Sequence, residues 1–323
     1  MSQNKKYLYL LLLIPLALVP TVIKSKYVLL LIDQVFVFII AVMGMNFISG
    51  LTGENNLGMA GIFALGAYGT AIATVQFGLP TIVGVLISIV IGLIFGLLIG
   101  YPTLRLKGVY FALTTQVLAE AVRLYFNNAK ELANGSNGIR NIPPLTLFGY
   151  TFSSKISMYY LFLVVCTLIL IVAVRLINGR WGRELKAIRD NIDGVESCGV
   201  DKSSAKVKAF ILCSVLGCLA GSMYAQLMTF ILPTSFNYDL TVKFVMMLML
   251  GGIGSVPGVV IGSTLVVILP EALRVLGDYY WLVFSILMLV IIIVRPYGLI
   301  SIYEDLKGRH ALKKSGAKGG GAE

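Results

Sequence analysis

Two pairs of opposite charges are the residues of this sequence best placed to do chemistry. Glu120 precedes Arg123, and Glu271 precedes Arg274, each by three positions within a long apolar stretch. A carboxylate inside a membrane can relay protons, but an arginine three positions further on lies on the same helix face and can neutralise it. The sequence therefore leaves two interpretations open: a proton relay, or structural ion pairs.

Motifs that would indicate an enzyme do not occur in the sequence. His310 is the only histidine, the four cysteines form no Cys-x-x-Cys pair, and neither Gly-x-Ser-x-Gly nor His-Glu-x-x-His is present. The glycine cluster 251–258 does not end in the Gly-Lys-Ser/Thr of a phosphate-binding loop. We predict no catalytic residue, no metal site and no cofactor. We interpret the cluster, with Gly251, Gly252 and Gly254, as a tight turn or a helix break along a polar path.

The composition predicts a membrane protein. Only 13% of the 323 residues are charged, 58% are hydrophobic and the mean hydropathy is +0.89, whereas soluble domains carry about 25% charged residues. The bilayer is therefore the expected solvent. The net charge of +11 is expected in cytoplasmic loops, so nucleic-acid binding is a poor interpretation.

Ten apolar stretches are candidates for membrane-spanning helices of about 20 residues. They cover residues 7–23, 28–49, 57–76, 80–100, 108–127, 157–177, 207–231, 235–251, 258–276 and 280–296. We predict an all-α polytopic membrane protein of about ten transmembrane helices, with a transmembrane domain over 1–306 and a disordered basic, glycine-rich tail over 307–323. The basic residues near both ends predict that both termini are cytoplasmic, although Lys24 and Lys26 count against this arrangement.

An internal similarity predicts a parallel repeat. The segment around Glu120 and Arg123 resembles the segment around Glu271 and Arg274 at a fixed offset, and Leu65-Gly66 matches Leu216-Gly217 at the same offset. The repeat would pair residues 57–127 with 208–278. Transporters often handle substrate at such repeat interfaces; chance similarity of apolar segments is the alternative.

Glycines and a few polar residues mark candidate packing or pathway positions. Small residues let helices approach closely in lipid, and glycine-rich helices could also slide around a translocation path. The candidates are Gly58, Gly61, Gly66, Tyr68, Thr114, Glu120, Arg123, Gly251, Gly252 and Gly254.

A polar segment over 178–206 interrupts the apolar pattern. Leu185, Ile188, Ile192 and Val195 recur at helical spacing, so we predict a short cytoplasmic helix with an apolar stripe and an i,i+4 pair between Lys186 and Asp190. Such a helix can transmit force from a partner; a solvated connecting loop is the alternative. The candidate contact residues are Trp181, Gly182, Arg183, Glu184, Lys186, Ala187, Arg189, Asp190 and Gly199. The other long polar segment, 128–156, is predicted to be an extracytoplasmic loop with tight turns.

These stretches together resemble the M-type (LivM-like) permease subunit of bacterial branched-chain amino-acid ABC importers. The resemblance covers about residues 30–300 and is carried by residues 56–68, 104–115 with Glu120 and Arg123, 134–139 leading to 142–143, 181–199, and 251–258. Members of that family often have Thr-Gly-Gly where this chain has Ala133-Asn134-Gly135.

The resemblance implies a protein that works with others in the bacterial inner membrane. The expected partners are a homologous H-type permease subunit, two cytoplasmic ATPase subunits and an extracytoplasmic amino-acid-binding protein, and residues 181–199 would seat in a groove of the ATPase. ATP hydrolysis by the partners would drive alternating access. Related subunits import urea or short amides, so that cargo stays open, as do an ion-gradient-driven secondary transporter and a channel or scaffold.

Overall fold

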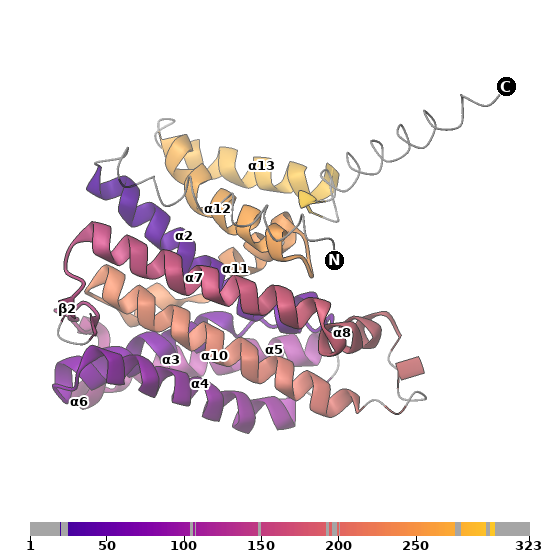
Figure 1. Cartoon of the computed structure of the whole chain (residues 1–323), viewed down its shortest axis with the longest axis horizontal. Coiled ribbons are helices and arrows are strands. Elements are labelled where there is room, and N and C mark those ends of the chain that lie inside the picture. Colours follow the sequence, from indigo (N-terminus) through magenta and orange to yellow (C-terminus); the bar gives the residue numbers. More distant parts are fainter. Residues whose placement is uncertain are drawn as a thin grey trace.

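The computed structural model describes residues 25–103, 106, 108–147, 150–191, 194–195, 199, 201–274, 279–294 and 298–300, together with Pro20. They form a bundle of long helices that run in broadly the same direction (Figure 1). The long helices are α2 (Lys26–Met45), α3 (Met59–Ala71), α4 (Thr81–Thr103), α5 (Val109–Asn128), α7 (Lys155–Asn178), α8 (Arg180–Asp190), α10 (Lys202–Met228), α11 (Tyr238–Gly251), α12 (Val256–Leu273) and α13 (Tyr280–Val294).

Shorter elements connect or extend these helices. Two π-helical turns, η1 (Asn46–Gly50) and η2 (Ile72–Gln76), continue α2 and α3. The remaining elements are α6 (Lys130–Ala133), η3 (Gly135–Asn137), the antiparallel strands β1 (Thr146–Leu147) and β2 (Tyr150–Thr151), and η4 (Pro233–Phe236).

The predicted all-α membrane architecture is confirmed, but the number of spanning helices is not. Each predicted span from 28–49 to 280–296 coincides with a described helix, whereas 7–23 lies outside the described residues. Within the described part of the chain, six helices are long and apolar enough to cross a membrane: α2 with η1, α3 with η2, α4, α7, α10 and α12. Helices α11 and α13 are shorter, and α5 carries more polar residues than the other long helices.

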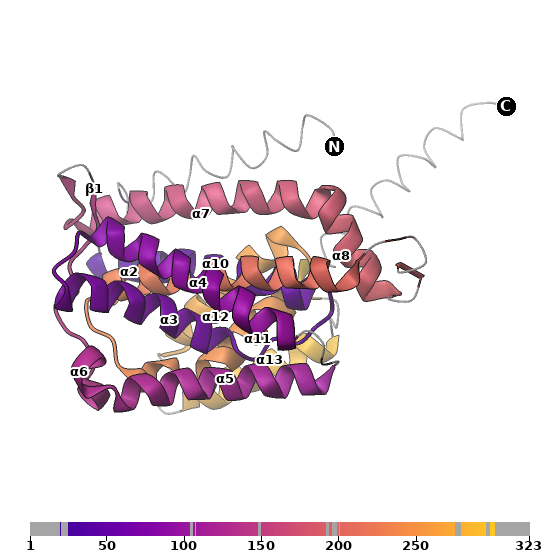
Figure 2. The same ribbon diagram turned by 90° about the horizontal axis from the view of Figure 1, so that it is seen from below.

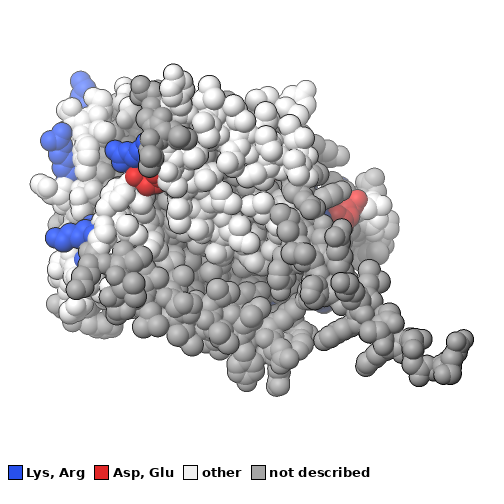
Figure 3. Space-filling view, turned by 90° about the horizontal axis from the view of Figure 1, so that it is seen from above, with Lys and Arg blue, Asp and Glu red and all other residues white. Residues whose placement is uncertain are grey.

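The bundle has two distinct ends. One end, here called the α8 end, holds α8 between the end of α7 and the start of α10, and the opposite end holds α6 and the β1–β2 hairpin (Figures 1 and 2). On the face drawn in Figure 3, charged atoms lie near the two ends, and the described surface between them shows neither colour. A charge-free band between two polar ends is the pattern of a membrane-spanning bundle.

Helix α10 lies at the centre, against α2, α3 and α4. Its contact with α3 is so close that a Cβ atom on Gly66 would overlap the Cys218 carbonyl, and one on Gly221 would overlap the Phe63 carbonyl. Contacts from Met59–Gly217 to Thr70–Ser222 advance in the same direction along both helices. The two helices are therefore parallel to each other, as the predicted repeat requires.

The packing around these helices is not symmetrical. Helix α4 packs on α10, whereas its counterpart in the predicted repeat, α11, packs mainly on α12 and touches α3 much less. The repeat therefore stays a prediction.

A cluster of hydroxyls fixes α4 to this pair. The Thr70 Oγ1 donates to Ser222 Oγ at 2.6 Å and lies 2.7 Å from Ser88 Oγ, while Ser88 Oγ also lies 2.8 Å from the Gly66 carbonyl. All three side chains are buried. Hydrogen bonds between helices supplement packing where lipid replaces water.

Replacing Gly66 with alanine should destabilise the bundle. The added methyl meets backbone of α10, which cannot rotate away, so α3 and α10 must separate at a cost of about 1–3 kcal/mol. Thermal unfolding of the detergent-purified protein should shift down accordingly. Gly84→Ala is the matched control, because its Cβ would meet the methyl groups of Thr74 and Thr70 at 3.1 and 3.3 Å. An equal shift in both variants would contradict the proposed backbone contact.

Candidate coupling surface and helix interfaces

Helix α8 is attached to the bundle at a sharp corner after α7. A Cβ atom on Gly182 would overlap the Ile177 carbonyl, so the approach of α8 to the end of α7 requires glycine. Leu185 and Ile188 are fully buried, and the Trp181 ring stacks on Phe47 with centroids 5.8 Å apart. The predicted apolar stripe therefore exists over this part, and it faces the chain's own bundle rather than a partner.

The rest of the predicted stripe is only partly described. Helix α8 ends at Asp190, and Asn191 has an extended backbone. Ile192 lies outside the described residues, whereas Val195 packs partly buried against the core. Gly199 occupies a turn with φ +76°, as the turn prediction required.

The polar residues of α8 remain toward solvent. The Arg183 Nη1 donates to the Asn178 carbonyl at 3.1 Å, Ala187 is exposed and Lys186 is half-buried. The predicted Lys186–Asp190 pair is wrong: among the ion pairs of the described residues, Glu184 pairs with Arg180 at 3.0 Å and Asp190 pairs with Arg189 at 3.3 Å. Both i,i+4 pairs fit the spacing, and contacts to the neighbouring chain decide which one forms.

Arg189 points into the chain's own structure. Its Nη1 donates to the Gly50 carbonyl at 3.1 Å, and a Cβ atom on Gly53 would lie 2.9 Å from the Arg189 Cγ. A Cβ atom on Gly254 would lie 3.7 Å from the same guanidinium nitrogen. Arg189 thus occupies a slot between three glycines, although 39% of its side chain stays exposed.

The glycine cluster after α11 forms a tight turn, as predicted. Helix α11 ends at Gly251 and α12 begins at Val256, and Gly252 and Gly254 have φ of +123° and +80°. A Cβ atom on Gly251 would overlap the Gly258 carbonyl, so the two helices need glycine where they meet. The described segment after α13 also joins this turn, because the Leu299 N–H donates to the Leu250 carbonyl at 2.8 Å.

The glycines at the start of α3 serve helix packing. A Cβ atom on Gly58 would lie 2.8 Å from the Thr115 carbonyl, and one on Gly61 would lie 2.5 Å from the Ala119 Cα. The Gly58 N–H donates to the Asn56 side-chain oxygen at 2.8 Å. Further along, Tyr68 is buried and stacks on Phe126 with centroids 4.0 Å apart. These contacts bring α3 against α5 and agree with the packing interpretation.

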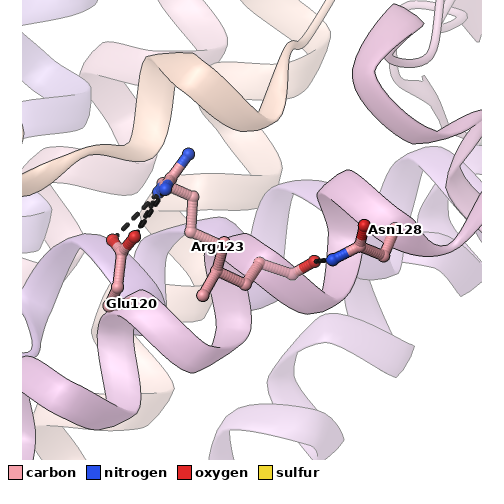
Figure 4. Close-up of polar contacts among 4 residues, drawn as sticks. Glu120, Arg123 and Asn128 are labelled. Atoms are coloured by element: carbon pink, nitrogen blue, oxygen red, sulfur yellow. Dashed lines mark hydrogen bonds and ion pairs between the residues drawn. The ribbon is translucent and has the colours of Figure 1, made fainter.

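Both predicted Glu–Arg pairs are present. The Arg123 Nε donates to the Glu120 Oε2 at 2.9 Å (Figure 4), and the Arg274 Nη1 donates to the Glu271 Oε1 at 3.3 Å. The Glu120 side chain is 43% exposed and that of Arg123 is 21% exposed, so this pair lies on the outward surface of α5. Thr114, on the same helix, donates to its own helix at the Tyr110 carbonyl.

Three buried polar groups were missed by the sequence analysis. Glu54 and Lys206 form a buried ion pair between the segment before α3 and the start of α10. Asp33 is a further ionisable residue inside an apolar helix, and it is fully buried without a hydrogen-bond partner among the described residues. Asn46 is buried in η1. Asp33 and Asn46 were visible as polar interruptions of the span 28–49, whereas nothing local identifies the partner of Glu54.

This geometry defines a polytopic helical membrane protein that carries a charged surface helix fixed to one end of its bundle. The chain belongs to the family described as branched-chain amino acid transport system / permease component, whose profile matches residues 27–293.

Individual relatives agree with this family. The high-affinity branched-chain amino acid transport system permease protein LivM of Escherichia coli K12 is 30% identical over 98% of this chain and 80% of its own length. The probable branched-chain amino acid transport permease protein LivM of Methanocaldococcus jannaschii is 29% identical over 62% of each chain. The autoinducer 2 import system permease protein LsrC of Yersinia enterocolitica is 30% identical over 35% of this chain and 34% of its own. No solved structure matches the chain.

Removing one partner of the Glu54–Lys206 pair should be costly. Lys206→Met leaves the Glu54 carboxylate buried and unpaired, which destabilises by about 3–5 kcal/mol. The double variant Glu54→Leu with Lys206→Met should recover much of this loss, because it leaves no buried charge behind. Thermal unfolding measures both effects, and Glu184→Ala serves as the control, since its exposed pair with Arg180 is worth less than about 1 kcal/mol. A double variant no better than the single one would show that packing, not charge, sets the cost.

Proposed function

We propose that this chain is the transmembrane permease subunit of an ATP-binding-cassette importer for branched-chain amino acids in the bacterial inner membrane. The observation that carries this proposal is the similarity to LivM over nearly the whole chain. The surface helix α8 agrees with it, because a subunit that hydrolyses no ATP itself needs a place where separate ATPases can act. Alternating access would follow if ATP binding by the partners favours one of two packings of the helices.

The α8 end is the side proposed to face the cytoplasm. Basic residues gather there: Arg175, Arg180, Arg183, Lys186, Arg189, Lys202, Lys206 and Lys208. Such an excess marks the cytoplasmic side of membrane proteins. The segment 298–300 also lies at this end, beside the 251–255 turn, which supports a cytoplasmic C-terminus. The binding protein would then dock at the opposite end, over residues 128–156.

The outward charges of α8 are the proposed contact with the ATPase. Arg183, Glu184, Lys186, Ala187 and Asp190 lie on faces that the bundle leaves accessible. The buried residues Leu185 and Ile188 hold the helix in place from behind. Arg189 and Trp181, which were candidates for the same contact, are bound to η1 instead, so their proposed role is to position α8.

Helix α5 is the proposed contact with the second permease subunit. Its outward surface is largely apolar, with Tyr110, Val117 and Tyr125 more than half exposed, yet it also carries the Glu120–Arg123 pair. Charged groups in the middle of a helix are expensive against lipid. A homologous subunit, with the translocation path between the two, would cover this surface. Figure 2 shows α5 along one side of the bundle, away from α7.

A permease for urea or short amides remains the second candidate, because it would use the same coupling helix and differ only in cargo. A carrier driven by an ion gradient is a different machine. It would need a carboxylate that changes protonation, and Glu120 is bound by Arg123.

Charge reversal on α8 should uncouple the complex. In vesicles that contain the permease pair, the ATPases and the binding protein, Arg183→Glu with Lys186→Glu should abolish ATP-dependent leucine uptake and ATPase co-purification, because like charges replace the attractive contacts. The matched control, Arg183→Lys with Lys186→Arg, keeps both charges and should retain uptake. Wild-type uptake that persists without the ATPases would contradict the importer. Uptake of urea but not leucine would change only the cargo.

Exchanging the charges of α5 separates an ion pair from a proton relay. Glu120→Gln leaves Arg123 without its partner and should reduce uptake by about tenfold, which corresponds to about 1.4 kcal/mol. The swap Glu120→Arg with Arg123→Glu restores a pair of the same spacing and should recover most of that uptake. A relay needs its carboxylate at one position, so loss of uptake in the swapped variant, with assembly intact, would favour the gradient-driven carrier.

A further inference from the structure

The end of α2 contacts two parts of the α8 end that are far apart in sequence. Toward α8, Phe47 stacks on Trp181 and the Gly50 carbonyl accepts a hydrogen bond from Arg189. Toward the turn between α11 and α12, the Asn46 Oδ1 accepts a hydrogen bond from the Gly254 N–H at 2.8 Å. All of these groups on α2 belong to η1, a single π-helical turn. Such turns are rare and often occur at functional sites.

Asn46 is the residue that joins the two contacts. It is fully buried, and its bond to Gly254 spans 208 positions of sequence. A Cβ atom on Gly50 would overlap the Asn46 Oδ1 and lie 2.9 Å from the Gly254 nitrogen. Gly50 must therefore lack a side chain for the Asn46–Gly254 bond to form beside the carbonyl that Arg189 uses.

The contacts on the two sides of η1 share atoms and leave little room for independent motion. Gly254 lies close to the Gly50 carbonyl and to the Arg189 guanidinium, at 3.4 and 3.7 Å from the position of its Cβ. A displacement of α8 by even an ångström would break the bond from Arg189 to Gly50 or carry η1 with it. Because η1 also holds Gly254, movement of η1 must displace the start of α12 or break a second buried hydrogen bond.

We propose that Asn46 is a positioning residue that makes α8, the end of α2 and the 251–255 turn move as one body during transport. This inference rests on the proposed function, since it assumes that an ATPase acts on α8. It extends that function by naming the route from α8 to α11 and α12, which meet at the turn. Truncation of Asn46 leaves α8 with its outward residues, so the ATPase can still dock and hydrolyse ATP.

Distance measurements test the rigid connection directly. Arg180 and Ile253 are exposed positions on α8 and on the turn, and each can be replaced by a spin-labelled cysteine in a Cys198→Ser background. The three cysteines that remain are buried. In the assembled complex the distance between the labels should stay the same with and without ATP. In Asn46→Ala the ATP-bound distribution should shift or broaden, while a distance that changes with ATP in the wild type overturns the proposal.

The transport stoichiometry gives a second readout that a purely structural role would not change. Asn46→Ala should lower leucine uptake per ATP hydrolysed by about fivefold, the lower range of coupling between sites, with co-purification and hydrolysis retained. Thr52→Ala is the matched control: this buried hydroxyl follows the same turn but donates only to the Ile48 carbonyl, so its stoichiometry should stay at the wild-type value.

The outcomes separate the two proposals. A wild type without ATP-dependent uptake defeats the proposed function. A coupled wild type in which Asn46→Ala matches Thr52→Ala, or in which uptake and hydrolysis fall in proportion, defeats only the role of Asn46.

Discussion

The bundle depends on the backbone contact between α3 and α10. In lipid no hydrophobic force drives helices together, so adhesion comes from close packing and internal hydrogen bonds. Gly66 and Gly221 supply the packing by admitting the carbonyls of the opposite helix, and Thr70 with Ser222 supplies hydrogen bonds. Because α10 also packs on α2 and α4, this one contact sets the positions of the helices around it. The start of α10 is fixed in the same way by Asp201, which caps it, and by Lys206, which pairs with Glu54.

The sequence predicted those parts of the structure that are local. Apolar stretches located the helices, Glu120 and Glu271 were paired correctly with the arginines one turn later, and the 251–258 glycines were recognised as a turn. Contacts between distant segments were out of reach. Glu54 and Lys206 are 152 positions apart, and helical periodicity reports which residues share a face but not what that face meets. For the same reason the pattern of α8 predicted an apolar stripe without showing that the stripe is turned inward, and it selected Lys186 as the partner of Asp190 when the fold had placed Arg189 there.

The inward stripe changes how a partner could recognise α8. With Leu185 and Ile188 buried in the chain's own bundle, the accessible residues are charged, and exposed ion pairs contribute about 1 kcal/mol or less each. Charges at an interface favour encounter and the choice of partner more than affinity. Tight assembly with an ATPase would then need shape complementarity along the whole of α8, whereas the arrangement of Arg183, Glu184 and Asp190 would discriminate between ATPases of related importers.

The differences in packing also indicate where the chain can move. The α3–α10 contact cannot slide, because a shift by one residue would drive Cβ atoms into the carbonyls that now face Gly66 and Gly221. Helix α12 is less deeply buried than α2, α3 and α10, and α11 and α12 are joined to the α8 end through the 251–255 turn that Asn46 and Leu299 hold. Conformational change in tightly packed proteins proceeds by rearrangement between discrete packings rather than by continuous deformation. A fixed α3–α4–α10 core and a group of α8, α11 and α12 linked through η1 is therefore the division of this chain that a two-state transport cycle would require.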